Sequence, residues 1–105
     1  MTAAVITATS VAKIDAPISQ VSGSNRRMKT LYLEGAKAAQ NDWFLLTTYL
    51  TTAESAQIAG WRAVTEASGN AHAIDVITYD SDDAKLDLTS TDTGVSKVFV
   101  DYYEA

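Results

Sequence analysis

The sequence predicts an all-β domain, a small β-sandwich or barrel-like meander of six to seven strands with one short helix near residues 51–59. Residues that suit a pleated sheet are abundant, with thirteen Thr, eight Val, six Ile and five Tyr. Apolar and polar residues alternate in most segments, which is the period of a half-buried strand. Turn-forming residues recur every 8 to 12 positions or so, about the spacing found in small sandwiches and barrels.

The amino-terminal region has two interpretations. Residues 4–15 alternate without strong turn signals, so they form either another strand or part of an extended arm over residues 1–20. Pro17 has no N–H to donate and is expected to interrupt regular pairing. After a polar, glycine-containing loop, residues 26–35 alternate again and predict the next strand.

The middle of the chain predicts a strand and the helix. Residues 42–50 are rich in aromatic and β-branched side chains and follow a turn-like Gln-Asn-Asp sequence, which favours a strand. Thr51 and Glu54 have the spacing of a capping box, with helix-forming residues behind them. A helix of one or two turns is therefore expected over residues 51–59.

The second half of the chain has the pattern of a meander, in which alternating segments are separated by Gly, Asn, Asp and Ser. The expected strands are residues 61–66, 74–79, 85–89 and 95–103, and the expected turns are residues 68–70, 80–83 and 91–94. On the last strand Val98, Val100 and Tyr102 lie on one face, opposite Lys97, Phe99 and Asp101.

Length, charge and composition limit the function. The 105 residues fit a single domain over residues 1–105, and a domain this small often gains burial from a partner subunit. A net charge of -5 argues against a nucleic-acid partner. No apolar run approaches the roughly 20 residues that cross a bilayer, so no membrane partner is expected.

Catalysis is not expected. His72 is the only histidine, the chain has no cysteine, and no G-x-S-x-G sequence accompanies the histidine. A nucleophile needs a base and an orienting group beside it, and the pattern provides no such set. A histidine at the edge of a strand is the favoured interpretation of His72.

The acidic turn formed by Asp80, Asp82 and Asp83 is the one candidate cation site, because carboxylate oxygens are the ligands that Ca²⁺ prefers. Its spacing lacks the glycine and the distal glutamate of an EF-hand loop, and clustered carboxylates in a turn are usually solvated. We therefore favour the interpretation that the acidic turn binds no metal and that the chain binds no other cofactor.

Charge asymmetry and aromatic content point to association between copies. The first 74 residues carry six basic and five acidic groups, whereas the remainder has a net charge of -6, which suits head-to-tail contact between basic and acidic ends. The adjacent Tyr102 and Tyr103 face opposite sides of a strand, so at least one lies at a surface, rim or interface. The candidate interface residues are Arg26, Arg27, Lys29, Trp43, Tyr102 and Tyr103.

Five segments that contain the predicted strands and turns follow one another over most of the chain. Its segments are SGSNRRMKTLYLEG, NDWFLLTTYL, GWRAVTEASGN, VITYDSDDAKLDLTS and VSKVFVDYYEA. In this order the chain resembles the small β-structured virion proteins of tailed phages and related viruses. The resemblance lies in the pattern and in no signature residue, and it implies a head-decoration or comparable accessory role without catalysis.

The expected function is therefore that of a non-enzymatic virion protein that binds itself and other virion structural proteins on a capsid or tail lattice. The resemblance implies a virion location, with assembly in the host cytoplasm. The alternative is a small carbohydrate- or protein-binding β module, with Trp61 or exposed tyrosines as a stacking platform and the acidic turn as a calcium site.

Overall fold

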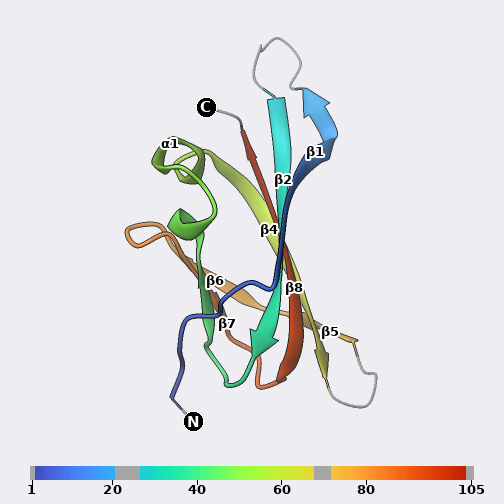
Figure 1. The fold of residues 1–105 in the computed structure, drawn as a ribbon, viewed down its shortest axis with the longest axis vertical. Helices are drawn as coiled ribbons and strands as arrows, with labels where there is room; N and C mark the ends of the chain where they lie inside the picture. The colour runs from blue at the N-terminus through green and yellow to red at the C-terminus, as the bar shows by residue number, and fades with distance from the viewer. Residues whose placement is uncertain (1, 21–26, 68–71, 104–105) are drawn as a thin grey trace.

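The computed structural model describes residues 2–20, 27–67 and 72–103. These residues form eight strands, one 3-10 turn and one short helix, so the all-β prediction is confirmed (Figure 1). The elements are β1 (Ser10–Gln20), β2 (Arg27–Lys37), β3 (Trp43–Leu45), η1 (Leu46–Thr48), α1 (Thr52–Ser55), β4 (Ile58–Ala67), β5 (His72–Asp75), β6 (Ile77–Asp80), β7 (Lys85–Leu88) and β8 (Gly94–Tyr103).

The larger sheet has five antiparallel strands in the order β1-β2-β8-β4-β5. The carboxyl-terminal strand β8 is therefore its centre, and it pairs with β2 on one side and β4 on the other. Leu33 lies opposite Val98 in the first pairing, and Ala63 lies opposite Val98 in the second. The register consequently places apolar side chains from three strands in one row of the sheet.

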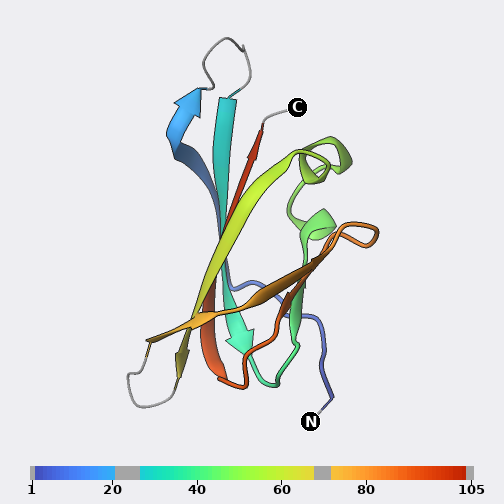
Figure 2. The ribbon, with the colours of Figure 1, turned by 180° about the vertical axis from the view of Figure 1, so that it is seen from behind.

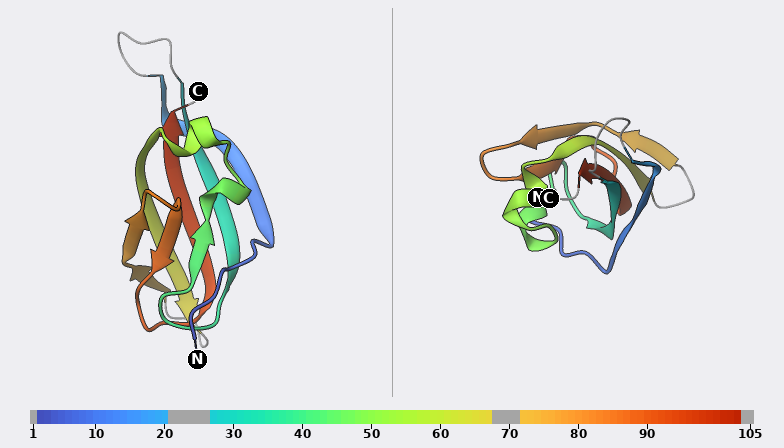
Figure 3. Two further views of the ribbon diagram at one scale, coloured as in Figure 1. Left: turned by 90° about the vertical axis from the view of Figure 1, so that its left-hand side faces the viewer. Right: turned by 90° about the horizontal axis from the view of Figure 1, so that it is seen from above.

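The smaller sheet has the order β3-β7-β6 and packs on the inner face of the larger one (Figure 3). The chain passes from one sheet to the other at Val76, where β5 ends and β6 begins, so a strand expected over residues 74–79 is divided between the two sheets (Figure 2). Trp61 of β4 and Tyr79 of β6 also join the sheets, with ring centroids 5.1 Å apart.

The amino-terminal segment crosses between the two sheets on the side where β3 and β2 lie. Ile6 donates its N–H to the Trp43 carbonyl at 2.7 Å, and Thr9 donates to the Glu34 carbonyl at the same distance. The segment therefore runs from the small sheet to the large one. Gly35 makes the crossing close, because a Cβ at this position would lie 2.6 Å from Ile6 Cγ2.

Asp42 fixes the same segment to the turn before β3. Its carboxylate accepts N–H groups from Ala4 at 2.9 Å, Ala38 at 2.8 Å and Ala39 at 3.0 Å. Burial raises the pKa of this carboxyl, but the hydrogen bonds from the three backbone N–H groups lower it by more. The pKa of Asp42 therefore lies below its ordinary value.

The strand interpretation of the amino-terminal region applies to Ser10–Gln20, which forms β1 beside β2. Pairing is regular from Ser10 to Asp15 and shifts in register before Gln20. Pro17 lies within this shift, which confirms that it interrupts regular pairing.

The core lies between the two sheets and consists mainly of side chains from β2, β7 and β8. Its fully buried members are Leu31, Leu33, Phe44, Leu46, Leu86, Leu88, Val98, Val100 and Tyr102. Their removal from water is the main favourable contribution to folding of this chain.

The strand predicted over residues 42–50 is wrong in its second half. After β3 the chain turns into η1, where Tyr49 and Leu50 both donate their N–H groups to the Leu46 carbonyl. Leu46 and Leu50 are four residues apart and both buried, a helical spacing that the aromatic and β-branched composition obscured.

The capping box is confirmed, but the helix is shorter than expected. Glu54 donates its N–H to Thr51 Oγ1 at 3.1 Å, and Thr51 donates its own N–H to Glu54 Oε1 at 2.9 Å. The helix ends at Ser55, and Ile58 already belongs to β4 because it pairs with Tyr102.

Candidate interaction surface

The outer face of the five-stranded sheet is the main candidate surface. Among the described residues, the small sheet, the helix and the amino-terminal crossing all lie on the other side of this sheet (Figures 1 and 3). Alternation along β8 buries Val98 and Val100 and directs Phe99 to the outer face. From the registers, we define the outer face by Tyr32, Glu34, Arg62, Val64, Glu66, Lys97, Phe99 and Asp101.

Two aromatic rings and a guanidinium occupy the middle of this outer face. Tyr32 of β2 and Phe99 of β8 are direct cross-strand neighbours with ring centroids 5.1 Å apart. The Arg62 guanidinium lies 4.6 Å from the centroid of the Phe99 ring. Aromatic and arginine side chains are enriched at protein interfaces, and their clustering here is typical of a binding surface.

Charged side chains surround the aromatic pair and form cross-strand contacts. Lys97 Nζ lies 2.6 Å from Glu66 Oε1, and Arg62 lies 3.6 Å from Asp101 Oδ2. All four side chains are partly exposed, so each pair contributes little to folding stability. The outer face therefore combines an apolar centre with charged groups that remain accessible to a partner.

Burial of Tyr32 and the neighbouring carboxylates raise the pKa values of two groups on the outer face. Burial and the hydrogen bond to Glu34 raise the pKa of Tyr32, whose hydroxyl donates to Glu34 Oε2 at 2.8 Å. The hydrogen bond to Glu66, and the charge of that carboxylate, raise the pKa of Lys97. Both shifts favour the states that Tyr and Lys ordinarily have at neutral pH, a neutral Tyr32 and a positively charged Lys97.

Exposed aliphatic side chains extend this surface towards both edges of the sheet. Ile74 on β5 is 84% exposed and Ile14 on β1 is 49% exposed. Their registers, Ile74 with Val64 and Ile14 with Thr30, place both on the outer side. Exposed apolar side chains are therefore present at both edge strands of the sheet.

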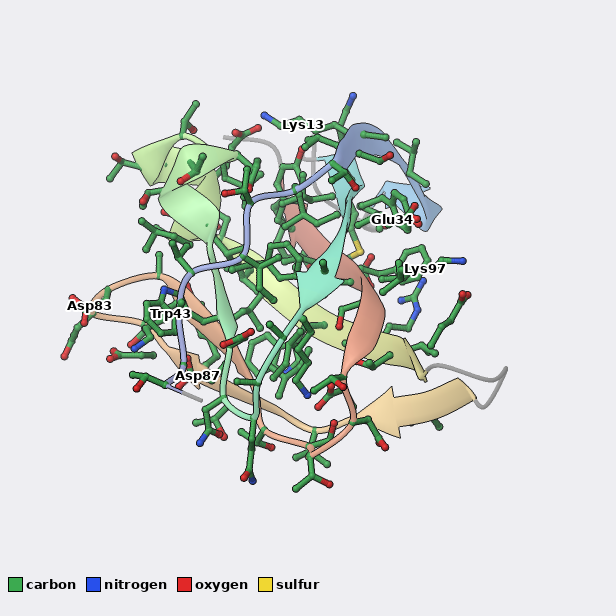
Figure 4. The ribbon with its side chains drawn as sticks, turned by 60° about the horizontal axis from the view of Figure 1, so that its bottom comes forward. Lys13, Glu34, Trp43, Asp83, Asp87 and Lys97 are labelled. Carbon is green, nitrogen blue, oxygen red and sulfur yellow. The ribbon has the colours of Figure 1, made fainter. Side chains whose placement is uncertain are left out.

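Trp43 lies on a different surface, the outer side of the small sheet. It is partly buried, and Lys85 Nζ lies 4.0 Å from the centroid of its ring. Figure 4 shows Glu34 and Lys97 together on one side of the molecule, with Trp43 and Asp87 on the opposite side. Trp43, one of the expected interface residues, therefore lies apart from the outer face.

The other expected interface residues do not form one patch. Arg26 lies outside the described residues, and only the backbone of Arg27 is described, at the start of β2. Lys29 is partly buried and pairs in register with Tyr102, on the inner side of the sheet. Tyr102 is fully buried, which corrects its assignment to a surface, because its side of β8 faces the core. Tyr103 is partly exposed on the opposite side.

The acidic turn is exposed at the β6–β7 hairpin. Asp82 donates its N–H to Asp80 Oδ1 at 3.0 Å, and Asp80, Asp82 and Asp83 are all open to solvent. Within the described ranges, no three acidic or histidine side chains lie close enough to hold a metal ion.

His72 begins β5, and its side chain is outside the described part of the structure. Among the described residues there is no pocket, and no helix has the length and apolar character needed to cross a membrane.

A buried polar cluster, which sequence reasoning missed, joins strands of the larger sheet to the loop that follows β7. Lys37 Nζ contacts Asp75 Oδ2 at 2.8 Å and donates to the Ser90 carbonyl at 2.8 Å. Thr65 Oγ1 donates to the same Asp75 oxygen at 2.8 Å and lies 2.8 Å from Ser96 Oγ. The cluster fastens β2, β4, β5 and β8 of the larger sheet to one another and to the loop at Ser90, so its role is structural.

The fold and its exposed side chains define a small all-β protein with one extensive open sheet face. No family model, curated protein or solved structure matches the chain.

Proposed function

We propose that the chain is a non-enzymatic structural protein that associates with copies of itself and packs into a larger protein assembly. The observation that supports this proposal is the outer face, where Tyr32, Phe99 and Arg62 lie together on the five-stranded sheet. A surface of this composition is suited to another protein surface, because it has an apolar centre and a charged rim.

The virion is the proposed setting of this assembly, on the basis of the sequence resemblance alone. In such a setting many identical copies bind a capsid or tail lattice, and weak contacts gain strength by multivalency. Other virion structural proteins are then the partners, and assembly takes place in the host cytoplasm.

A carbohydrate-binding module is the second candidate, favoured by the exposure of Trp61. This side chain is 41% exposed beside Tyr79, and sugar rings stack on exposed aromatic faces. Binding of glycans to the isolated protein, with loss of binding in Trp61→Ala, would support this candidate.

Light scattering across protein concentration, with and without calcium, tests the leading proposal. We expect a discrete oligomer whose mass is a multiple of 11.2 kDa and does not depend on calcium. A monomer that persists at high concentration would contradict self-association. A melting temperature raised by calcium would favour the carbohydrate-binding candidate.

A further inference from the structure

We infer that a second copy of this chain packs face to face on the outer face, about a two-fold axis that passes between the Phe99 side chains of the two copies. The inference rests on the proposed function, because it identifies the surface through which copies associate. It also specifies an isologous contact, in which the same residues of both copies take part.

The position of Phe99 provides the geometry. Strand β8 is the middle strand of the five-stranded sheet, and Lys97, Phe99 and Asp101 share its outer side. A two-fold axis across the strand at Phe99 places the second β8 antiparallel to the first. Lys97 of each copy then lies opposite Asp101 of the other, and the two Phe99 rings meet at the axis.

Both charged groups can take a second partner. Lys97 already contacts Glu66 and remains 36% exposed, and an ammonium group has three donors. Asp101 contacts Arg62 and accepts a hydrogen bond from Thr30 at 2.5 Å, and its side chain is 24% exposed. A carboxylate has about four acceptor positions, so the intermolecular pair adds to the internal contacts.

The size of the sheet agrees with what a stable dimer requires. Five strands about 4.8 Å apart, with about eight residues each at about 3.3 Å per residue, present a face of about 600 Å². This value is the lower end of the range for specific interfaces, which bury about 600 to 1,000 Å² per partner. The contact covers Tyr32 and Phe99 and brings Ile14 and Ile74 towards its rim.

The outer face carries both charges of the intermolecular pair, Lys97 and Asp101, which favours a second copy as the occupant. Two chains of net charge -5 repel each other, most strongly where Asp80, Asp82 and Asp83 are exposed. The small sheet that carries this acidic hairpin packs on the inner side of the large sheet (Figure 3). Face-to-face contact through the outer face therefore keeps the two acidic hairpins apart while opposite charges meet at Lys97 and Asp101.

Charge exchange between copies tests this arrangement. Lys97→Asp places two carboxylates opposite each other in its own dimer, and Asp101→Lys places two ammonium groups there. We expect each variant alone to dimerise at least about tenfold more weakly than the unmodified chain. A one-to-one mixture restores both opposite-charge contacts, so sedimentation equilibrium should give a mass of about 22 kDa, twice 11.2 kDa.

Mixing separates the intermolecular effect from folding, because it leaves the internal contacts of each variant unchanged. Circular dichroism melting of each variant checks that it is folded. The matched controls are Lys85→Asp and Asp83→Lys on the small-sheet side, which should leave the mass of the dimer unchanged.

The outcomes distinguish this inference from the proposed function. If the unmodified chain is a discrete oligomer but neither variant weakens it, or the mixture does not recover, the assigned surface is wrong while self-association stands. If the unmodified chain is a monomer at all concentrations, both are overturned.

Discussion

Lys37 and Asp75 form an ion pair of 2.8 Å in which neither side chain is exposed to solvent. The residues come from β2 and β5, which are not adjacent in the sheet, and the pair is completed by Ser90 and Thr65. A buried charge is costly unless it is paired and hydrogen-bonded. This cluster therefore holds β2, β4, β5 and the loop at Ser90 in place, because displacement of any one of them would leave a buried charge without its partners.

Removal of one member of this pair should destabilise the chain strongly. Lys37→Met leaves the Asp75 carboxylate buried without its cation, and the expected loss is about 3 to 5 kcal/mol of unfolding free energy. Lys13→Met, at the exposed pair with Glu54, should cost less than about 1 kcal/mol. Urea unfolding of both variants measures the difference, and equal losses would contradict the structural role of the cluster.

Stability should fall in acid because the pKa values of two buried carboxyls are lowered in the folded chain. Burial raises the pKa of Asp75, but hydrogen bonds from Lys37 and Ser90 lower it below its ordinary value, as the backbone donors do for Asp42. Such groups stabilise the fold above their unfolded pKa of about 3.9, and this contribution is lost as the pH falls through their folded pKa.

Thermal melts between pH 7 and pH 2 measure this loss. Asp42→Asn should lower stability at pH 7 and make the decline below about pH 4 shallower, because one of the two carboxyls is absent. Asp83→Asn, in the exposed turn, leaves both buried carboxyls in place and should keep the full decline. An identical decline in Asp42→Asn and the unmodified chain would contradict this explanation.

Gly35→Ala should destabilise the crossing of the amino-terminal segment. The added methyl would lie 2.6 Å from Ile6 Cγ2 and 3.1 Å from the Thr7 carbonyl oxygen, and such overpacking costs about 1 to 3 kcal/mol. Gly60→Ala is the matched control, since nothing lies within 4 Å of its added methyl. Calorimetric melting should show a lower transition temperature for the first variant alone.

Thr51→Ala should weaken the start of α1. It removes the hydroxyl that accepts the Glu54 N–H, a change that costs about 1 kcal/mol in other helices. Thr52→Ala, one residue further on, keeps the capping box and should have a smaller effect. Chemical denaturation of the two variants compares them directly, and a larger loss in Thr52→Ala would contradict the assigned cap.

The fold was largely predictable from local pattern, whereas the buried cluster was not. Alternation correctly separated Lys97, Phe99 and Asp101 from Val98, Val100 and Tyr102, and the Thr51–Glu54 spacing correctly predicted a cap. Alternation does not say which of two faces is buried, and for that reason Tyr102 was assigned to a surface. The faces are decided by how the sheets pack, which is a tertiary effect.

Long-range partners carry no local signal in one sequence. Lys37 and Asp75 are 38 positions apart, and each resembles a solvated charge when its neighbours are considered alone. The same reason applies to the outer face, where Tyr32, Arg62 and Phe99 come from three strands that only the sheet order brings together.

The most direct test of association through the outer face is sedimentation equilibrium of Phe99→Glu beside the unmodified chain and Leu45→Glu. Leu45 is also half-buried but lies on the small sheet, so its substitution controls for the general effect of an added carboxylate. We predict a mass of 11.2 kDa for Phe99→Glu alone, with the other two proteins remaining oligomeric. If folded Phe99→Glu forms an oligomer at the same concentrations as the unmodified chain, association through the outer face is contradicted.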